Sequence, residues 1–472
     1  MIFSKSTLIA AASALLILFG AAAPSRATPS IVVDVASGAV LSHDQATASW
    51  YPASVTKLMT AYVALEAVRQ GRISLDTPVM MSPRACSMAP SKMGFRPGSE
   101  VTLQNALIML MVKSANDIAV AIAEGVSGSV EAFADEMNRH SAALGMTQSI
   151  WVNPNGLPDA RQVTSARDLA ILGRALYLQF PEHANLFNIG AMRLGKQIIP
   201  THNHLLGRYA GADGMKTGFT CSAGFNLVAS ATRGGRRLIA VVLGAPNPIL
   251  RTAKTAALLD RGFQSGAAVA SLASLPSSGP TAAPDLRESV CHHRGPAAAE
   301  FMAEIEDASV PVGSGVPLLD TLGGAPQQQM NAKEIAHLPR PRFEPVPVYV
   351  GRAPGYAGPV ARSRAPGAPV GEQPDLAAYA SSQPEASDAS ASPISKPAPD
   401  AVSLRRAKHT KAVKAARAAK AAAKADAAKV DVVVDEPAPK PKAARSATKP
   451  KAAAAQKPAA SKAHSAAEQG KS

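Results

Sequence analysis

The chain has 472 residues, a formal net charge of +15 and only three cysteines, and its composition divides it into two unlike halves. Up to about residue 266, apolar periodicity alternates with Gly and Pro as in globular proteins, whereas the rest is rich in Ala, Pro and Lys. Length alone would allow two or three domains, but this composition favours fewer. The spacing of the cysteines excludes the paired pattern of a zinc site.

Residues 1–27 have the pattern of a secretory signal peptide. Lys5 precedes an apolar run over residues 8–23, and the small residues Ser25 and Ala27 suit cleavage after Ala27. An uncleaved membrane anchor is the alternative. In either case we expect the rest of the chain to lie outside the cytoplasm, periplasmic or secreted, and we expect no later transmembrane segment.

The predicted domain covers residues 28–266, and its elements follow in order. Strands at 30–35 and 39–41 form a hairpin, and helices are expected at 58–70, 103–112, 117–124, 133–144 and 169–178. Strands at 225–232 and 238–243 flank a glycine turn, and a last helix covers 249–263. Because strands open and close the domain while helices fill its middle, the fold class predicted is α+β, an α/β/α sandwich with an antiparallel sheet.

Ser54 and Lys57 lie three residues apart at the start of the first helix. Residues at this spacing share a helix face, so the lysine can act as a base toward the serine hydroxyl. Apolar residues at helical spacing after Lys57 suggest a buried helix, and burial disfavours the ammonium form of a lysine. The alternative is an ordinary helix start in which Ser54 is the N-cap and Lys57 is solvated.

Two further polar motifs follow, each with a purely structural alternative when taken alone. Ser114–Ala115–Asn116 interrupts an apolar helix, where its side chains can simply cap backbone groups. Lys216–Thr217–Gly218 can be a strand end with a solvated lysine. The three motifs together, in this order, match the S-x-x-K, S-D-N and K-T-G set of class A β-lactamases and penicillin-binding proteins.

Each member of the set has a chemical role in this interpretation. Ser54 is the nucleophile, Lys57 its base, and Ser114 carries a proton to the leaving amine. Asn116 anchors the substrate amide and orients Lys57. The remaining candidates bind substrate: Lys216 supplies charge, Thr217 a hydroxyl for a carboxylate, Gly218 room at the strand edge, and the N–H groups of Ser54 and Phe219 an oxyanion hole.

From residue 31 to about residue 263 the chain resembles the D-alanyl-D-alanine carboxypeptidases, the low-molecular-mass penicillin-binding proteins. The resemblance rests on residues 52–60, 113–117, 153–157, 213–218 and 223–231. Two features differ from β-lactamases: Ala115 replaces the usual Asp, and no Glu-x-x-Leu-Asn stretch is present. The resemblance implies the β-lactamase and penicillin-binding-protein fold.

The resemblance also implies the reaction, in which Ser54 forms an acyl-enzyme with a peptidoglycan stem peptide, the terminal D-alanine leaves, and β-lactams acylate the same serine. No cofactor and no metal are expected, since His202 and His204 have no third ligand at useful spacing. Relatives keep an arginine near the substrate carboxylate at the place of Arg251, for which a surface arginine is the alternative. Phe219 departs from the His or Tyr often found there.

Three other functions compete with the carboxypeptidase. These are a D,D-endopeptidase that cuts peptidoglycan cross-links, a β-lactamase, and a wall-binding scaffold with a vestigial core. The intact set of motif residues argues against the scaffold. Cys86, Cys221 and Cys291 are interpreted as structurally incidental; one disulfide can form among them, and the sequence does not choose the pair.

The second half of the chain is predicted to be a largely disordered tail. Residues 267–403 are interpreted as a Pro-, Ala- and Gly-rich linker, mostly disordered with short ordered pieces. Residues 404–472 carry 17 Lys or Arg and 5 Asp or Glu, a net charge of +12, and are disordered or partly helical. The signal peptide argues against nucleic acid as the partner of this tail. An anionic membrane surface or acidic wall polymers are expected instead, with a solvated spacer as the alternative.

Overall fold

The computed structural model describes residues 28–276, 279–305, 308–313 and 328–364, so the predicted signal peptide and basic tail lie outside the described residues. Its central feature is a six-stranded sheet in the order β10-β2-β1-β9-β8-β7, with every neighbouring pair antiparallel. The strands are β1 (Ser30–Asp34), β2 (Ala39–Asp44), β7 (Ala212–Thr220), β8 (Gly224–Arg233), β9 (Arg236–Ala245) and β10 (Ala270–Ser271). The strand that carries the Lys216 motif, β7, is therefore an edge strand.

Alternate residues of the central strands enter two separate cores. Ile31 of β1 pairs with Val241 of β9, and both join the core on the face of α2 (Lys57–Arg69) and α7 (Ala166–Gln179). Val32 pairs with Ala240, and both join the core on the opposite face, under α8 (Pro248–Gln264). Side chains alternate across a strand, so the apolar residues in succession here require a cover on both faces of the sheet.

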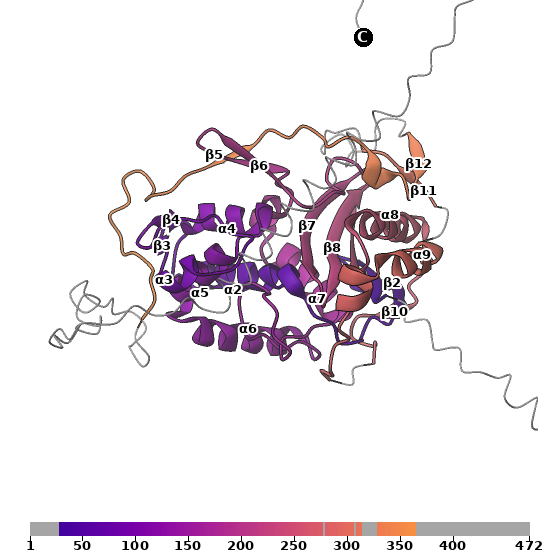
Figure 1. The fold of residues 1–472 in the computed structure, drawn as a ribbon, viewed down its shortest axis with the longest axis horizontal. Coiled ribbons are helices and arrows are strands. Elements are labelled where there is room, and N and C mark those ends of the chain that lie inside the picture. The colour runs from indigo at the N-terminus through magenta and orange to yellow at the C-terminus, as the bar shows by residue number, and fades with distance from the viewer. Residues whose placement is uncertain (1–27, 277–278, 306–307, 314–327, 365–472) are drawn as a thin grey trace, which may run out of the picture. The chain divides into compact units, whose positions relative to one another are not determined.

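Helices provide that cover (Figure 1). On one face lies α8 (Pro248–Gln264); α7 (Ala166–Gln179) contacts the other, and α2 (Lys57–Arg69) packs beside α7. Around α2 gather α4 (Leu103–Val112), α5 (Asn116–Ser127) and α6 (Val130–Leu144). The predicted α+β fold with an antiparallel sheet between helices is confirmed. Ser165 caps the start of α7, since its Oγ accepts from the Asp168 nitrogen. No helix within the described ranges is long and apolar enough to cross a membrane.

Smaller elements connect these layers. The antiparallel pairs β3–β4 and β5–β6 lie outside the main sheet. The first pair is β3 (Pro78–Met80) and β4 (Glu100–Thr102), with the short helix α3 (Pro83–Cys86) between them. The second pair is β5 (Ala191–Leu194) and β6 (Gln197–Pro200), preceded by the 3-10 helix η2 (Pro181–Phe187).

The chain beyond residue 266 departs from the prediction of a mostly disordered linker, because its described segments pack on the domain. They contain η3 (Glu288–His292), α9 (Arg294–Glu304), β11 (Ser309–Pro311), β12 (Gln329–Asn331), η4 (Ile335–His337) and β13 (Val346–Val348). Phe301, Ile305, Val310 and Ile335 are buried in the core under α8. β13 pairs with β5, and Ala361 forms a bridge with Val79. The folded unit thus continues past the predicted boundary.

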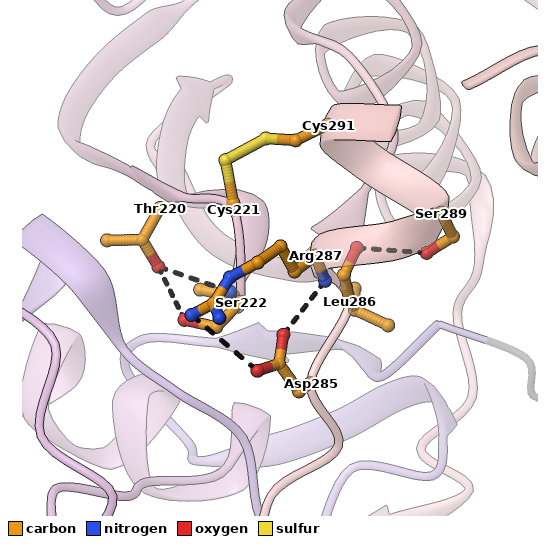
Figure 2. The surroundings of a disulfide bond; sticks show 9 residues. Thr220, Cys221, Ser222, Asp285, Leu286, Arg287, Ser289 and Cys291 are labelled. Atoms are coloured by element: carbon orange, nitrogen blue, oxygen red, sulfur yellow. Dashed lines mark hydrogen bonds and ion pairs between the residues drawn. A yellow bond between two sulfur atoms is a disulfide. The ribbon is translucent and has the colours of Figure 1, made fainter. Parts of the chain in front are cut away.

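Two of the cysteines are structural, which corrects their interpretation as incidental. Cys221, in the turn between β7 and β8, forms a disulfide with Cys291 in η3, across a sequence separation of 70 residues (Figure 2). Cys86 is a free thiol. The bond attaches the segment after residue 278 to the end of the edge strand.

Candidate active site

Ser54 lies in a short 3-10 turn, η1 (Ala53–Thr56), that leads directly into α2. Lys57 is the first residue of α2, and its Nζ lies 3.0 Å from Ser54 Oγ. The N-cap of α2 is Thr56, so Ser54 is not the helix cap that the alternative interpretation required. The structure therefore brings the candidate nucleophile and the candidate base into direct contact.

Lys57 is surrounded by oxygen atoms and has no exposed surface. Its Nζ contacts Asn116 Oδ1 at 2.8 Å and the Asn155 carbonyl oxygen at 2.5 Å. Burial first, and then the charge of Lys216, hold the pKa of Lys57 well below its ordinary value of 10.5, while Asp117 opposes this shift.

These contacts match the valence of a neutral amine, which has two N–H donors and one lone pair. Asn116 Oδ1 and the Asn155 carbonyl accept the two N–H groups. The lone pair then faces the Ser54 hydroxyl, which is the arrangement a general base needs. The carbonyl of Asn155 was not among the predicted site groups, because the sequence gives no sign of which backbone oxygen a lysine will meet.

Ser114 lies at the predicted junction between α4 and α5, and Asn116 is the first residue of α5. Ser114 is buried and has a φ of 61°, a left-handed conformation that non-glycine residues seldom adopt. The Asn116 Nδ2 donates to the Ala89 carbonyl at 2.9 Å, which fixes the amide so that its oxygen faces Lys57. Asn116 thus connects Lys57 to the loop between α3 and β4.

Gly218 allows β7 to lie against the turn that carries Ser54. A Cβ atom placed on Gly218 would lie 2.9 Å from the Pro52 carbonyl oxygen and 3.0 Å from the Ser54 nitrogen. Only a residue without a side chain fits this approach. The strand backbone and the Ser54 amide are therefore adjacent, as the predicted oxyanion hole of Ser54 and Phe219 requires.

Phe219 follows at the open edge of β7. Its side chain is 43% exposed and stacks on Phe225 of β8, with ring centroids 4.0 Å apart. The ring therefore flanks the site at the surface, where a His or Tyr is often found in the family.

Lys216, the first residue of the Lys216–Thr217–Gly218 motif, and Arg251 form a pair of buried cations. Lys216 is 2% exposed, and its Nζ donates to the Thr217 carbonyl at 3.0 Å. Burial, followed by the charge of Arg251, lowers the pKa of Lys216 to about 7. Thr217 is also buried.

Arg251 lies in the first turn of α8 and is 3% exposed, which excludes the surface arginine of the alternative interpretation. Its Nη1 donates to the Asn226 carbonyl at 3.4 Å, and its Nε has no partner among the described residues. Burial lowers its pKa to about 10. A buried guanidinium with an unpaired donor beside a second cation is suited to bind an anion such as a carboxylate.

The charges of Lys216 and Arg251 also lower the pKa values of two nearby histidines, His202 and His204. Burial lowers the pKa of each imidazole from 6.5 to about 4, with Lys216 as the next cause for His202 and Arg251 for His204. Both are neutral at pH 7 and add no charge to this end of the site. Within the described segments, no three His, Cys, Asp or Glu side chains gather as metal ligands.

Asn226 is a positioning residue that the sequence did not single out. It is fully buried on β8, and its Nδ2 donates to the carbonyls of Tyr51 at 2.9 Å and Pro52 at 3.0 Å. Its Oδ1 accepts from the Gly244 nitrogen at 2.9 Å. In the sequence, the one sign of this role is an asparagine within the otherwise apolar strand β8, which pairs with the strand that carries Lys216.

Similarity to known proteins agrees with this geometry. The family model that describes D-alanyl-D-alanine carboxypeptidases matches residues 20–247. The D-alanyl-D-alanine carboxypeptidase DacC of Escherichia coli is 37% identical over 273 residues, which cover 54% of this chain and 68% of that protein. DacA of Haemophilus influenzae is 36% identical over 251 residues, which cover 52% of this chain and 64% of that protein.

Among solved structures, penicillin-binding protein 5 from Haemophilus influenzae is 36% identical, with 50% of this chain and 71% of that chain covered and a TM-score of 0.48. The buried serine–lysine pair and the sequence similarity define an enzyme of the serine peptidase class. The chain belongs to the D-alanyl-D-alanine carboxypeptidase family, so the resemblance stated from its motifs is confirmed.

Proposed function

We propose that the chain removes the terminal D-alanine from peptidoglycan stem peptides through an acyl-enzyme on Ser54. The observation that carries this proposal is the contact of the buried Lys57 amine with the Ser54 hydroxyl, in a chain of the carboxypeptidase family. β-Lactams are then substrate mimics that acylate the same oxygen and leave it slowly.

Acylation begins when Ser54 Oγ attacks the carbonyl between the two D-alanines and its proton passes to Lys57 Nζ. The carbonyl oxygen becomes an oxyanion, which the N–H groups of Ser54 and Phe219 stabilise. Collapse of this intermediate breaks the peptide bond. The proton on Lys57 reaches the departing amine through Ser114, and D-alanine leaves as a neutral amine.

Deacylation reverses these roles with water in place of the amine. Lys57 accepts a proton from the water that attacks the ester carbonyl, and when the ester bond breaks Lys57 returns this proton to Ser54 Oγ, which releases the shortened peptide and restores the Ser54 hydroxyl. The low pKa of Lys57 supports this role, because a charged ammonium has no lone pair with which to accept a proton.

Recognition of the free carboxylate is assigned to Lys216, Thr217 and Arg251. The support is the unpaired Arg251 Nε beside a second buried cation, because an anion in this place would satisfy a donor that is otherwise unpaired among the described residues. Asn116 is expected to hold the amide of the penultimate residue, since its side chain lies beside Lys57, which contacts Ser54.

The test compares two substrates, a synthetic pentapeptide ending in D-Ala-D-Ala and a cross-linked muropeptide. We expect the pentapeptide to release D-alanine and the muropeptide to be cleaved at least tenfold more slowly, a ratio of about 1.4 kcal/mol in activation free energy. Cleavage of the muropeptide alone would instead assign the D,D-endopeptidase activity. A wall-binding scaffold would release no product from either substrate. Product release by wild type that is lost in Ser54→Ala therefore shows that the chain is an enzyme.

We further propose that the enzyme acts outside the cytoplasm. The Cys221–Cys291 disulfide supports this location, because disulfides persist in oxidising compartments. The predicted signal peptide at residues 1–27 and the basic tail at residues 404–472 lie outside the described residues. Deletion of residues 404–472 should weaken binding to anionic liposomes or sacculi at low salt; unchanged binding would leave the spacer alternative.

A further inference from the structure

A segment of the C-terminal extension, residues 338–343, lies across the turn that precedes β7. We call this segment the strap; it is part of the orange chain between β12 and β5 in Figure 1. Arg208 Nε donates to the Leu338 carbonyl at 3.0 Å, and a Cβ atom placed on Gly207 would lie 2.8 Å from Pro341 Cγ. The strap is thus held against the turn on both sides of residue 340. It lies outside the residues that the family model matches.

Arg340 of the strap brings an exposed positive charge to this turn. Next to burial, its charge is the cause that lowers the pKa of Arg208, and it also contributes to the lowered pKa values of His202 and His204. Charges that are exposed to water act over about 10 Å or less. The guanidinium of Arg340 therefore lies close to these three side chains.

The turn under the strap is attached to the end of the site that is assigned to the substrate carboxylate. Asn203 Nδ2 donates to the Gly214 carbonyl at 2.8 Å, which joins the turn to β7 two residues before Lys216. His202, the neighbour of Asn203, is close to four positive charges. In descending order of their effect on its pKa, these are Lys216, Lys113, Arg251 and Arg340.

The second of these cations, Lys113, lies on the side from which the leaving group departs. It directly precedes Ser114, which is proposed to pass a proton to the departing amine. None of the ion pairs within the described ranges includes one of the four cations. Because the imidazoles beside them are neutral at pH 7, the positive charge at this end of the site is not balanced and attracts anions.

A single carboxylate does not use all four charges. The α-carboxylate of the leaving amino acid is assigned to Lys216 and Arg251, which are buried. Lys113 is half-buried and Arg340 is exposed, so their donors can meet a ligand that extends from the site toward the surface. A second carboxylate, on the side chain of the leaving amino acid, has the charge and the position to meet them.

We propose that Arg340, together with Lys113, is a specificity-determining residue on the leaving-group side, which binds a second carboxylate carried by the leaving amino acid. The enzyme then releases an acidic D-amino acid more readily than a neutral one of the same size. The inference rests on the proposed carboxypeptidase function, because it assumes that the α-carboxylate of the substrate lies at Lys216 and Arg251.

The test uses three peptides that are identical up to the scissile bond and end in D-Ala-D-Ala, D-Ala-D-Glu or D-Ala-D-Gln. D-glutamine has the size of D-glutamate without its side-chain charge. We expect wild type to prefer the D-Glu peptide over the D-Gln peptide in kcat/KM by about two- to fivefold, the range of one exposed ion pair. Arg340→Glu should invert this preference, and Arg340→Lys should keep most of it.

Arg342→Ala is the matched control, because it removes a second exposed arginine of the strap that is not among the causes of the lowered pKa values of the two histidines. It should keep the wild-type ratio. In wild type, raising the salt concentration from about 0.05 M to about 0.5 M should lower the ratio, since an exposed charge is screened.

The ratio is measured within each variant, so a general loss of folded enzyme cancels. An unchanged ratio in Arg340→Glu would overturn the role of Arg340. So would a wild type that releases D-alanine but shows no preference for D-Glu over D-Gln, or that releases neither of these two. If wild type releases no amino acid from any of the three peptides, the proposed function fails first.

Discussion

Asn226 holds Pro52, and with it the turn that carries Ser54, against the sheet. The amide nitrogen of Asn226 donates to the Pro52 carbonyl at 3.0 Å, and its oxygen accepts from the Gly244 nitrogen at 2.9 Å. One buried side chain thus connects the neighbour strand β9 to the start of η1. Because catalysis depends on the position of Ser54 relative to β7, this connection should affect rate as well as stability.

We therefore expect Asn226→Ala to slow acylation of Ser54 by about 10- to 100-fold, the range expected for a displacement of about 1 Å at a reacting group. The free energy of unfolding should fall by about 1–3 kcal/mol, because buried backbone groups lose their partner. The rate of labelling by a fluorescent penicillin and urea denaturation measure the two effects.

Asn138→Ala is the control for this prediction. Asn138 bridges the Trp151 backbone in the same way, through Nδ2 at 2.8 Å and Oδ1 at 2.9 Å, but it lies on α6. It should lower stability and leave the labelling rate of the folded fraction near wild type. Equal loss of labelling rate in both variants would show that Asn226 acts only through stability.

Gly218→Ala should slow acylation by roughly 100-fold, because its Cβ would meet the Pro52 carbonyl and the Ser54 nitrogen and push β7 away from the oxyanion site. Gly266→Ala is the matched change, since a Cβ there meets no described atom within 4 Å. Labelling rates of the two variants at equal folded concentration provide the comparison. Similar rates for both would contradict the close approach of strand and turn.

The pH dependence of kcat/KM should separate Lys57 from Lys216. Lys57 must be neutral to accept a proton, so activity should rise with pH through its lowered pKa. Lys216 must be charged to hold a carboxylate, and its pKa is about 7, so activity on a peptide with a free carboxylate should fall as the pH rises through that value.

A C-terminally amidated peptide gives the contrast for this profile, because it has no carboxylate for Lys216 to bind. The ratio of free-acid to amide activity should therefore decline above about pH 7, and Lys216→Arg should move the decline to higher pH, since arginine stays charged. A ratio that is flat from pH 6 to pH 9 would remove Lys216 from carboxylate recognition.

Removal of the disulfide by Cys221→Ser with Cys291→Ser should lower the free energy of unfolding by about 2–4 kcal/mol, the typical contribution of a disulfide bond. Urea denaturation under non-reducing conditions measures the loss. Cys86→Ser, which changes a free thiol, should cause a much smaller change. If the double variant and Cys86→Ser have the same free energy of unfolding, residues 279–292 are held on the domain without the disulfide.

The parts of the fold that the sequence predicted are those with local signals. Helical periodicity identified α4 and α8 to within a few residues, and the glycine turn at 234–235 identified the β8–β9 hairpin. Each motif contributes a residue that the structure places against Ser54 or its base, namely Lys57, Asn116 and Gly218. The contact of Lys57 with Ser54 follows from a helical turn alone.

What the sequence did not predict depends on contacts between distant segments. The burial of Arg251 is determined by the packing of α8 on β8. The pairing of Cys221 with Cys291 is determined by where residues 279–292 lie on the domain. The extension after residue 266 has little periodicity, yet single apolar residues such as Phe301 and Val310 enter the core under α8. No local pattern shows where such isolated side chains will pack.

The central claim is that Ser54 forms the acyl-enzyme with Lys57 as its base, and mass spectrometry of the protein after brief exposure to benzylpenicillin tests it most directly. We predict a single adduct of the mass of the antibiotic on the peptide that contains Ser54, absent in Ser54→Ala and formed at least 100-fold more slowly in Lys57→Ala, within the range of about 10²–10⁴ for loss of a general base. An adduct on another residue, or folded protein that remains unmodified, would contradict the account.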